Sequence, residues 1–503
     1  MDADGRRSRL DALRSRVGRG LRERFRIDRR ALAAFRIALG CLLVADLLLR
    51  SRSLRAFYTD EGVYPVADFH ASSDPLYLSL HAISGEAWVQ VLLFCVAGLL
   101  GIALAVGYRT RIATVGSWLM LVSLHNRMPD VLNGGDVLLR LLLFWAIFLP
   151  LGARWAVDSG QRTDDPDRRH VASLASAALL CQVVLVYLVN AAMKLSGEIW
   201  LRGEGLAYVF SLGQFTVFLG DHLEAVPPLL VAGDYLWLAM VATAFLLVVL
   251  RGRSRTAYVG LFVAMHVGMG LTMQLGLFPL ISVAALLPFL PAWFWDRAVP
   301  PLADRRPVAG ARRALRGLAA WLPTVRSTDV PPTLSRWTVR ARTAVVVCVL
   351  VLVVLWNVQF LGYGEVAGQD VTPEVADAAI DLTRTDQYWT MFAPDPLSVD
   401  GWLVAPATFP NGTRIDAFHG GRVTWDRPND VSSTYPTHRW RKYLTGLWRS
   451  GSADRQRFAD YLCGRYDDDW PHLRNVSVYY VEQPTRLDGP EPTERVRLAT
   501  QDC

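Results

Sequence analysis

The chain has 503 residues, of which 52% are hydrophobic and 17 are tryptophan. With a positive mean hydropathy of +0.23, this composition argues against an ordinary soluble enzyme of this length. The formal net charge is +7, and arginine supplies nearly all of the positive charge, since Lys194 and Lys442 are the only lysines. Membrane insertion is therefore the first hypothesis.

Apolar runs recur along most of the chain at lengths that suit, or nearly suit, a bilayer crossing. They cover residues 31–49, 87–106, 112–124, 137–151, 171–193, 227–250, 257–275, 277–295 and 343–361. We therefore expect an all-α polytopic membrane bundle of about eight helices within residues 31–296. One further transmembrane helix is expected at 343–361.

The basic residues between these runs predict the orientation. With a cytoplasmic N-terminus, the cytoplasmic segments hold 30 lysines and arginines and the outer connections hold five. Cytoplasmic loops collect such residues, so we expect a multi-pass protein of the cell membrane with its N-terminus inside. Residues 1–30, with eleven arginines, are read as a basic cytoplasmic segment against anionic lipid, not as a signal peptide or nucleic-acid arm. Residues 297–342 are read as a basic cytoplasmic linker.

An odd number of crossings places residues 362–503 outside the cell. This region holds 15 basic and 21 acidic residues, so the positive charge of the chain belongs to the cytoplasmic segments and predicts no nucleic-acid partner. Strand-like pieces at 401–409, 421–426 and 475–483, with a helix-like piece at 453–466, predict a small mixed α+β extracytoplasmic domain. The cysteine spacing suggests no metal site, and a disulfide between Cys463 and Cys503 is permitted.

Ionisable groups inside the apolar runs are functional candidates, because charge at membrane depth is costly. They are Arg36, Asp46, Arg140, Lys194, His266 and the polar turn at 123–136. Arg36 and Asp46, ten positions apart, fall close to one helix face, and packing against neighbouring helices is the simpler explanation. The turn offers His125, Asn133 and Asp136 beside a Gly-Gly pair, where the aspartate suits a helix N-cap. For His266, in a glycine-rich helix, the alternative is a packed, hydrogen-bonded core histidine.

Lys194 closes the apolar run YLVNAAMK in a chain that otherwise uses arginine. A lysine at a helix end can extend its ammonium group into the lipid headgroups, but an arginine would do this equally well. Unlike arginine, a desolvated lysine can lose its proton and act as a general base. The residue choice therefore favours a titratable amine at the outer membrane face.

Six segments, spanning some 240 residues, carry a family resemblance in their order along the chain. They are FYTDEGVYP (57–65), GYRTR (107–111), NGGDVLLRLLLF (133–144), RWAVD (154–158), YLVNAAMKLSGEIWLRG (187–203) and MHVGMGLTMQLGLFPL (265–280). The pattern resembles the vitamin K-dependent gamma-carboxylase family and its bacterial relatives that carry the HTTM (horizontally transferred transmembrane) domain.

The resemblance implies roles for particular residues. In the characterised carboxylases, a lysine before a Trp-containing segment is the base that acts on reduced vitamin K, and Lys194 before Trp200 occupies that place. The family's membrane histidine resembles His266, ahead of Phe278. Asn133 matches an asparagine that precedes a histidine in the animal enzymes; here Gly134 follows it. The implied catalytic residues are thus Lys194, His266 and Asn133, and the implied cofactor-binding residues are His125, Asp136, Trp200 and Phe278.

The family chemistry implies a quinone-dependent lyase. Reduced vitamin K or menaquinol would lose a proton to the lysine, and its reaction with oxygen would drive removal of a glutamate γ-proton and addition of carbon dioxide. The glutamate would belong to a protein or peptide on the outer side. The alternative is a non-catalytic membrane protein that binds a lipid or protein partner through its outer domain. A transporter is less favoured, because no inverted repeat of broken helices is visible.

The outer domain departs from the carboxylases, because it is short and does not resemble their propeptide-binding domain. It contains QYWTMFAPDP (387–396), which is similar to a segment of prokaryotic HTTM proteins. Aromatic residues favour the membrane–water interface. We therefore expect this segment to pack the outer domain onto the membrane surface through Trp389 and Phe392.

Overall fold

The structure is a computed structural model of the whole chain. It describes residues 15–72, 77–161, 169–303, 332–363, 384–466 and 472–503, together with residues 310, 313, 314, 317, 320, 321, 323, 365, 366, 369, 370, 380 and 381. Half of the predicted basic N-terminal segment and much of the predicted linker at 297–342 lie outside the described residues. The chain is mostly helical, with a small sheet near its C-terminus.

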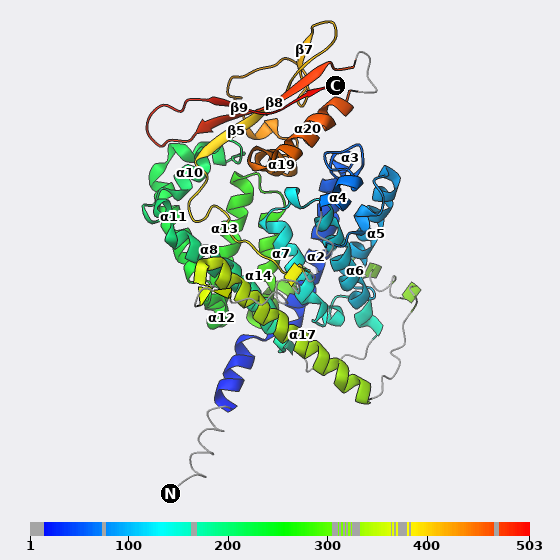
Figure 1. Cartoon of the computed structure of the whole chain (residues 1–503). Helices are drawn as coiled ribbons and strands as arrows, with labels where there is room; N and C mark the ends of the chain where they lie inside the picture. The colour runs from blue at the N-terminus through cyan, green and yellow to red at the C-terminus, as the bar shows by residue number, and fades with distance from the viewer. Residues whose placement is uncertain are drawn as a thin grey trace.

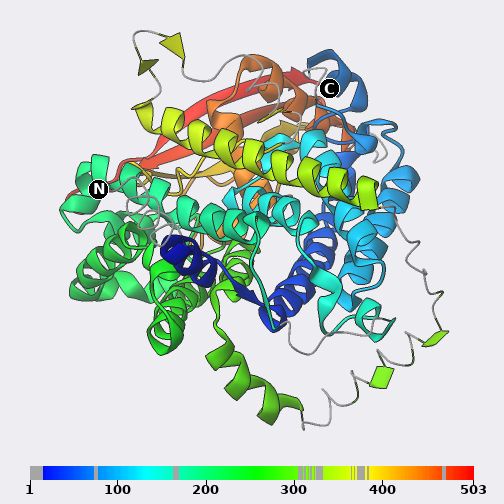
Figure 2. The same cartoon turned by 90° about the horizontal axis from the view of Figure 1, so that it is seen from below.

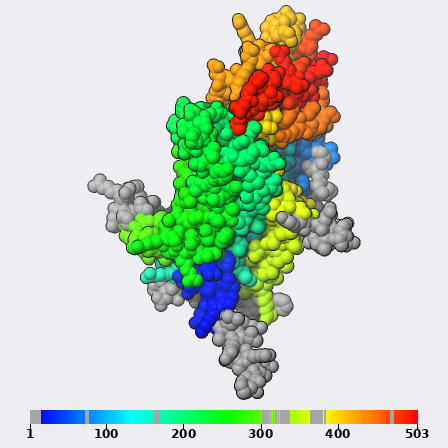
Figure 3. All heavy atoms as spheres, turned by 90° about the vertical axis from the view of Figure 1, so that its left-hand side faces the viewer, coloured from blue at the N-terminus to red at the C-terminus, as the bar shows by residue number. Residues whose placement is uncertain are grey.

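A helical body carries the C-terminal domain on one end, and the first described residues, 15–24, lie at the opposite end (Figure 1). The space-filling view shows the same order, with the orange and red C-terminal residues above the green helices (Figure 3). A large apolar cluster fills the helical body, and a second one joins helix ends to the C-terminal domain. The two parts thus share buried surface.

The first half of the body contains four longer helices, and each packs against the next of the four along the chain. They are α2 (Arg29–Ser51), α5 (Ala87–Val106), α6 (Thr110–Arg127) and α7 (Gly134–Ile147). Asp28 caps α2 by accepting a hydrogen bond from the backbone N–H of Arg30. Nearly every side chain of α7 is buried, so this short helix forms the centre of the bundle.

The second half surrounds α7 and completes the body. It consists of α8 (Leu174–Ser196), α9 (Glu198–Leu201), α10 (Gly205–Ser211), α11 (Pro227–Ala242), α12 (Leu246–Val249), α13 (Gly252–Thr272), α14 (Phe278–Leu286), α15 (Ala292–Ala303) and α17 (Pro332–Val358). Seen from below, α17 runs along one side of the body (Figure 2). Only 22% of its most apolar window is buried, against 72% for α8, so α17 is peripheral and α8 central.

Four helices in the described part of the chain are long and apolar enough to cross a membrane. They are Arg29–Ser51, Ala87–Val106, Leu174–Ser196 and Thr338–Gly362. The prediction of a single helix at 277–295 was wrong, because Phe278–Phe289 and Ala292–Pro300 meet at a bend of 109°. Pro291 lies at the bend, where a proline removes a backbone donor and ends the helix. The run at 227–250 is likewise divided, into α11 and α12.

The C-terminal domain is a five-stranded antiparallel sheet with two helices, α19 (His438–Arg449) and α20 (Ser452–Gly464). Its strands are β5 (Val399–Val404), β6 (Pro406–Thr408), β7 (Arg414–Asp416), β8 (Asn475–Pro484) and β9 (Glu494–Asp502). The central strand, β8, pairs with β5, β6 and β9. The mixed domain is confirmed, but residues 421–426 form no strand, and β7 does so instead. A disulfide joins Cys463 at the end of α20 to Cys503 beyond β9.

Candidate functional site

A polar stripe runs along α8 on the face that meets residues 385–396. Gln182, Asn190 and Lys194 are spaced by eight and four positions, so they lie on one face of the helix. All three are buried. Polar groups inside an apolar helix need partners, and the segment that follows Arg384 supplies them.

The segment is bound through its backbone and side chains. The Gln182 amide donates to the Gln387 side-chain oxygen at 2.8 Å. Asn190 donates to the carbonyls of Trp389 at 2.9 Å and Met391 at 3.3 Å. The Trp389 indole is fully buried and donates to Gln387 at 2.9 Å. The expectation that this segment packs on the membrane surface was wrong, because its hydrogen bonds hold it inside the helical body.

Lys194 ends the stripe and is fully buried. Its Nζ donates to the Phe392 carbonyl at 3.1 Å and lies 3.0 Å from the centroid of the Trp200 ring. The Trp200 indole donates to the same carbonyl at 2.8 Å. Trp237 supplies a second aromatic face, 5.6 Å from Nζ. The amine is thus held by one carbonyl and by aromatic faces that attract a cation.

The backbone at Phe392 is turned to present that carbonyl. Its φ of 56° lies in the left-handed region, which costs a residue with a side chain about 1–2 kcal/mol. The phenyl ring packs edge-on against Phe215, with centroids 5.3 Å apart. Two donors, the lysine amine and the indole N–H, bind the resulting carbonyl and stabilise the conformation.

The nearest acidic groups act on Lys194 without forming an ion pair within the described part of the chain. Asp234 and Asp395 both contribute an attractive field at the amine. Asp395 accepts a hydrogen bond from the backbone of Ile199 at 2.9 Å. Asp234 is 1% exposed, and one of its carboxylate oxygens accepts a hydrogen bond from the backbone N–H of Leu206 at 3.0 Å. Its other carboxylate oxygen has no hydrogen-bond partner among the described residues. No carboxylate bound directly to the amine therefore stabilises its charged form among the described residues.

His266 is buried in α13, and its Nδ1 lies 2.9 Å from the Phe262 carbonyl, one turn earlier. Its ring lies 6.0 Å from both Tyr187 of α8 and Phe278 at the start of α14. His266 and Phe278 are therefore in one aromatic cluster. The same contacts also suit a packed core histidine, the alternative reading from the sequence.

Asn133, and not Asp136, is the N-cap of α7, so the expectation for the aspartate was wrong. The Asn133 side chain accepts a hydrogen bond from the backbone N–H of Gly135 at 2.7 Å, and the Asp136 carboxylate accepts one from the Asn133 N–H at 2.8 Å. A side chain at Gly135 would meet the Phe278 backbone at 2.9 Å. The glycine is thus needed for the close approach of α14.

Asp136 has a second role, in a buried cluster of four charges. Arg50 donates to Asp46 and to Asp136, both at 2.7 Å. Arg439 of the C-terminal domain donates to Asp46 at 2.6 Å and to Asp136 at 2.9 Å. Two arginines balance two aspartates, and all four are at most 5% exposed at the side chain. We call this set the four-charge cluster.

His125 lies beside the four-charge cluster. It is fully buried, with Nε2 3.9 Å from the nearer Asp136 oxygen. Neither ring nitrogen has a hydrogen-bond partner among the described residues. The expected site residues thus form two groups, one with Lys194 and Trp200 and one with Asn133, His125, Asp136, His266 and Phe278. Between the two groups run Trp389 to Phe392, with the Met391 sulfur 3.3 Å from the Cβ position of Gly134.

Several residues of this region were missed in the sequence. Arg50 follows the first apolar run and stands one helical turn after Asp46, so the i,i+4 spacing was a usable signal. Gln182 and Asn190 share helical spacing with Lys194. Nothing local marked Arg439, which lies 393 positions from Asp46.

The other charged candidates serve packing. Arg36 donates to four backbone carbonyls, the shortest being that of Trp155 at 2.6 Å, and does not bind Asp46. Arg140 pairs with Asp386 at 3.1 Å, close to the bound segment. Among the described residues, no group of three or more His, Cys, Asp or Glu side chains is placed to hold a metal ion.

Comparison with known proteins gives one match. A family model described as HTTM domain matches residues 25–293, which is more than half of the chain. The match covers α2 to α14 and therefore Lys194 and all the other expected site residues. No curated protein and no solved structure matches the chain.

Proposed function

This chain belongs to the HTTM domain family, and on that premise we propose that it is a membrane enzyme in which Lys194 takes a proton from a reduced lipid quinone. One observation carries the proposal: a fully buried lysine amine lies on the face of Trp200 without an ion-pair partner among the described residues. A group of this kind can accept a proton, whereas an arginine in its place could not. Proton transfer at a buried site is the task for which lysine is suited.

The surroundings suit a flat, apolar ring. The rings of Trp200 and Trp237 flank the amine, and Asp234 offers a carboxylate oxygen that has no partner within the described part of the chain. A bound menaquinol or vitamin K hydroquinone would supply the reducing power that, with oxygen, drives removal of a glutamate γ-proton and carboxylation of a protein or peptide. A quinol hydroxyl would take the place of the Phe392 carbonyl at Nζ, so we infer that residues 389–395 shift when the substrate binds.

We propose that the chain crosses the cell membrane an odd number of times, with the N-terminus in the cytoplasm and the C-terminal domain outside. The bias of basic residues supports this orientation, as do the first described residues (blue) and the C-terminal domain (red) at opposite ends of the helical body (Figure 3). The Cys463–Cys503 disulfide supports an oxidising compartment. Single cysteines placed at exposed Arg422 and at Arg253, in a background without the native cysteines, test this with a membrane-impermeant maleimide. In intact cells, only the cysteine at position 422 should be labelled. Labelling only at position 253 would show that the chain has the opposite orientation.

The activity is tested by oxygen-dependent epoxide formation from reduced menaquinone and vitamin K hydroquinone, with protein in nanodiscs. We expect epoxide from the wild type and none from Lys194→Ala or Lys194→Arg. Lys442→Arg is the matched control, since it makes the same exchange at the only other lysine, an exposed residue of α19. Wild-type turnover in Lys194→Arg would refute the role of the lysine as base.

A second function has its own supporting observation, the hydrogen bond from Lys194 to the Phe392 carbonyl. In this reading Lys194 anchors the segment at 387–396, and the protein is a non-catalytic membrane component that binds a lipid or protein through its C-terminal domain. This function predicts no epoxide from the wild type or from any variant. It also predicts that Lys194→Ala lowers the melting temperature, whereas Lys194→Arg keeps a melting temperature close to that of the wild type. Epoxide from the wild type would exclude this function.

A further inference from the structure

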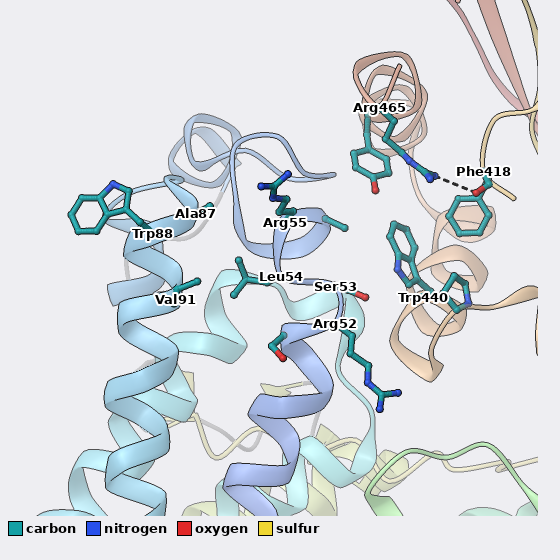
Figure 4. A pocket seen from close by; sticks show the side chains of 14 residues that line it. Arg52, Ser53, Leu54, Arg55, Ala87, Trp88, Val91, Phe418, Trp440 and Arg465 are labelled. Carbon is teal, nitrogen blue, oxygen red and sulfur yellow. Dashed lines mark hydrogen bonds between the residues drawn. The ribbon is translucent and has the colours of Figure 1, made fainter. Parts of the chain in front are cut away.

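A cavity of about 690 Å³ lies between the end of α2, the start of α5 and the C-terminal domain (Figure 4). Its volume is in the range of small-molecule binding sites. One wall comes from the residues that follow α2 and from α5, and the other from the loop before α19 and from α19 and α20. Lys194 and the other expected site residues do not line it, so it is separate from the proposed quinol site.

The cavity is positively charged. Arg52, Arg55 and Arg465 line it, and none of the described residues that form its wall is acidic. Arg465 donates to the carbonyls of Ala417 at 3.4 Å and Phe418 at 3.2 Å, the latter drawn in Figure 4. Arg52 and Arg55 are exposed, and their guanidinium groups form no hydrogen bond or ion pair with the described residues. Two free guanidinium groups beside a third cation attract an anion, and phosphate oxygens match their geometry.

The same cavity has an apolar side that faces away from the bundle. Trp88 and Val91 of α5 line it and are 68% and 50% exposed, and Figure 4 shows Trp88 pointing outward from the helix. Exposed apolar residues continue down α5 at Leu92, Leu99 and Ile102. Helical spacing puts them on one stripe, which a membrane would cover with acyl chains. The ligand that fits is therefore an amphiphile, with an anionic head and apolar tails.

We propose that this cavity binds the phosphate headgroup of an anionic phospholipid, with the acyl chains along the exposed stripe of α5. Arg55 points toward the top of the cavity and Arg52 toward the bottom (Figure 4), so the two arginines contact the headgroup at different heights. Trp88 lies at the apolar end, the usual place of tryptophan at a membrane interface. A bound lipid touches both the helical body and the C-terminal domain, and it stabilises their contact by binding only the docked form.

The experiment compares lipid binding by the full chain and by a charge-reversed variant. The protein is exchanged into mixed micelles of detergent and phosphatidylcholine, and phosphatidylglycerol is then added in increasing amounts. Native mass spectrometry gives the fraction of protein that carries bound phosphatidylglycerol. Arg52→Glu with Arg55→Glu is the test variant, because these side chains have no partner to lose within the described part of the chain. Arg422→Glu with Arg449→Glu makes the same change in net charge at exposed positions of the C-terminal domain outside the cavity.

We expect the wild type and the control variant to retain phosphatidylglycerol equally, and the test variant to bind it at least about tenfold more weakly. The melting temperature should rise with phosphatidylglycerol in the wild type and not in the test variant. Equal binding by the test and control variants would overturn the proposal, as would equal wild-type affinity for phosphatidylcholine. Displacement of the lipid by millimolar glycerol phosphate would also overturn it, because the site would then bind a soluble phosphate compound.

Discussion

Arg439 and Asp46 lie 393 positions apart in the chain, yet Nη2 of the arginine is 2.6 Å from the carboxylate. Arg439 is presented by α19 of the C-terminal domain and Asp46 by α2 of the helical body. The contact completes the four-charge cluster, in which each carboxylate is bound by both arginines. A buried cluster of zero net charge fixes how the two parts dock, because any other register would leave charge unpaired.

Arg439→Gln should destabilise the protein strongly. It leaves two buried carboxylates with one arginine, and breaking a buried ion pair costs about 3–5 kcal/mol. The melting temperature in detergent would show the loss as a large decrease. Arg449→Gln, on the exposed face of the same helix, should change stability by less than about 0.5 kcal/mol.

A second substitution should partly rescue this loss. Asp46→Asn in the Arg439→Gln background restores zero net charge, with Arg50 and Asp136 still paired at 2.7 Å. We expect the double variant to be at least about 1 kcal/mol more stable than the sum of the two single changes predicts. Simple additivity would show that the charges are not coupled.

Gly135→Ala should destabilise the protein, whereas Gly134→Ala should be tolerated. A Cβ at position 135 would lie 2.9 Å from the Phe278 backbone, which cannot move without shifting α14, and such overpacking costs about 1–3 kcal/mol. At position 134 the nearest atom is the Met391 sulfur at 3.3 Å, and a methionine side chain can adjust. Melting temperatures of the two variants, measured side by side, test the close approach of α14 to α7. Equal losses would contradict this geometry.

Stability should decrease as the pH falls below neutral because of His438 in α19. Burial, with the neighbouring Arg439, lowers the pKa of His438 from its ordinary 6.5 to about 4. Between these values the unfolded chain binds a proton and the folded protein does not, so the free energy of unfolding falls as the pH decreases from about 6.5 to about 4. From pH 7 to pH 5 this loss is about 2 kcal/mol.

The control for His438 is His438→Gln, which removes the titrating group and keeps a polar side chain of similar size. The melting temperature of this variant should decrease less between pH 7 and pH 5 than that of the wild type. Parallel pH profiles for the two proteins would show that the acid sensitivity arises elsewhere.

Removing the disulfide should loosen the C-terminal domain. The bond joins Cys463 to Cys503, 40 positions later, and ties α20 to the end of β9. Cys463→Ser with Cys503→Ser should cost about 2–4 kcal/mol, since the unfolded chain is no longer constrained. Wild-type protein in dithiothreitol should melt like the double variant. Cys41→Ser, which replaces a free cysteine of α2, should have no effect in either condition.

The helices were the part that local sequence signals could predict. Long apolar runs predicted α2, α5, α8 and α17, and the alternation of apolar and polar residues predicted β8. Both signals are local, because burial of one face of a helix or strand leaves a periodic pattern in nearby residues. The proline at 291 bends one predicted helix by 109°, and its effect was also readable locally.

The charged candidates were visible in the sequence because charge inside an apolar run is conspicuous. Lys194, Asp46 and Arg36 were all identified in this way, but their partners were not. Lys194 binds a carbonyl 198 positions away, and Arg36 binds backbone carbonyls and not the aspartate on its own helix. A side chain's need for a partner is a local property, whereas the identity of the partner depends on which segments meet.

The sequence by itself thus determined a membrane-type helical body, a mixed C-terminal domain and the positions of three of its buried charges, Lys194, Asp46 and Arg36. Only the tertiary structure decided that residues 387–396 lie inside the body along α8, and that Arg439 closes the four-charge cluster. The physical reason is that hydrophobic periodicity shows which face of a helix or strand is buried, but not which segment of the chain covers that face. Hydrogen bonds and ion pairs between distant segments form only after the helices have packed.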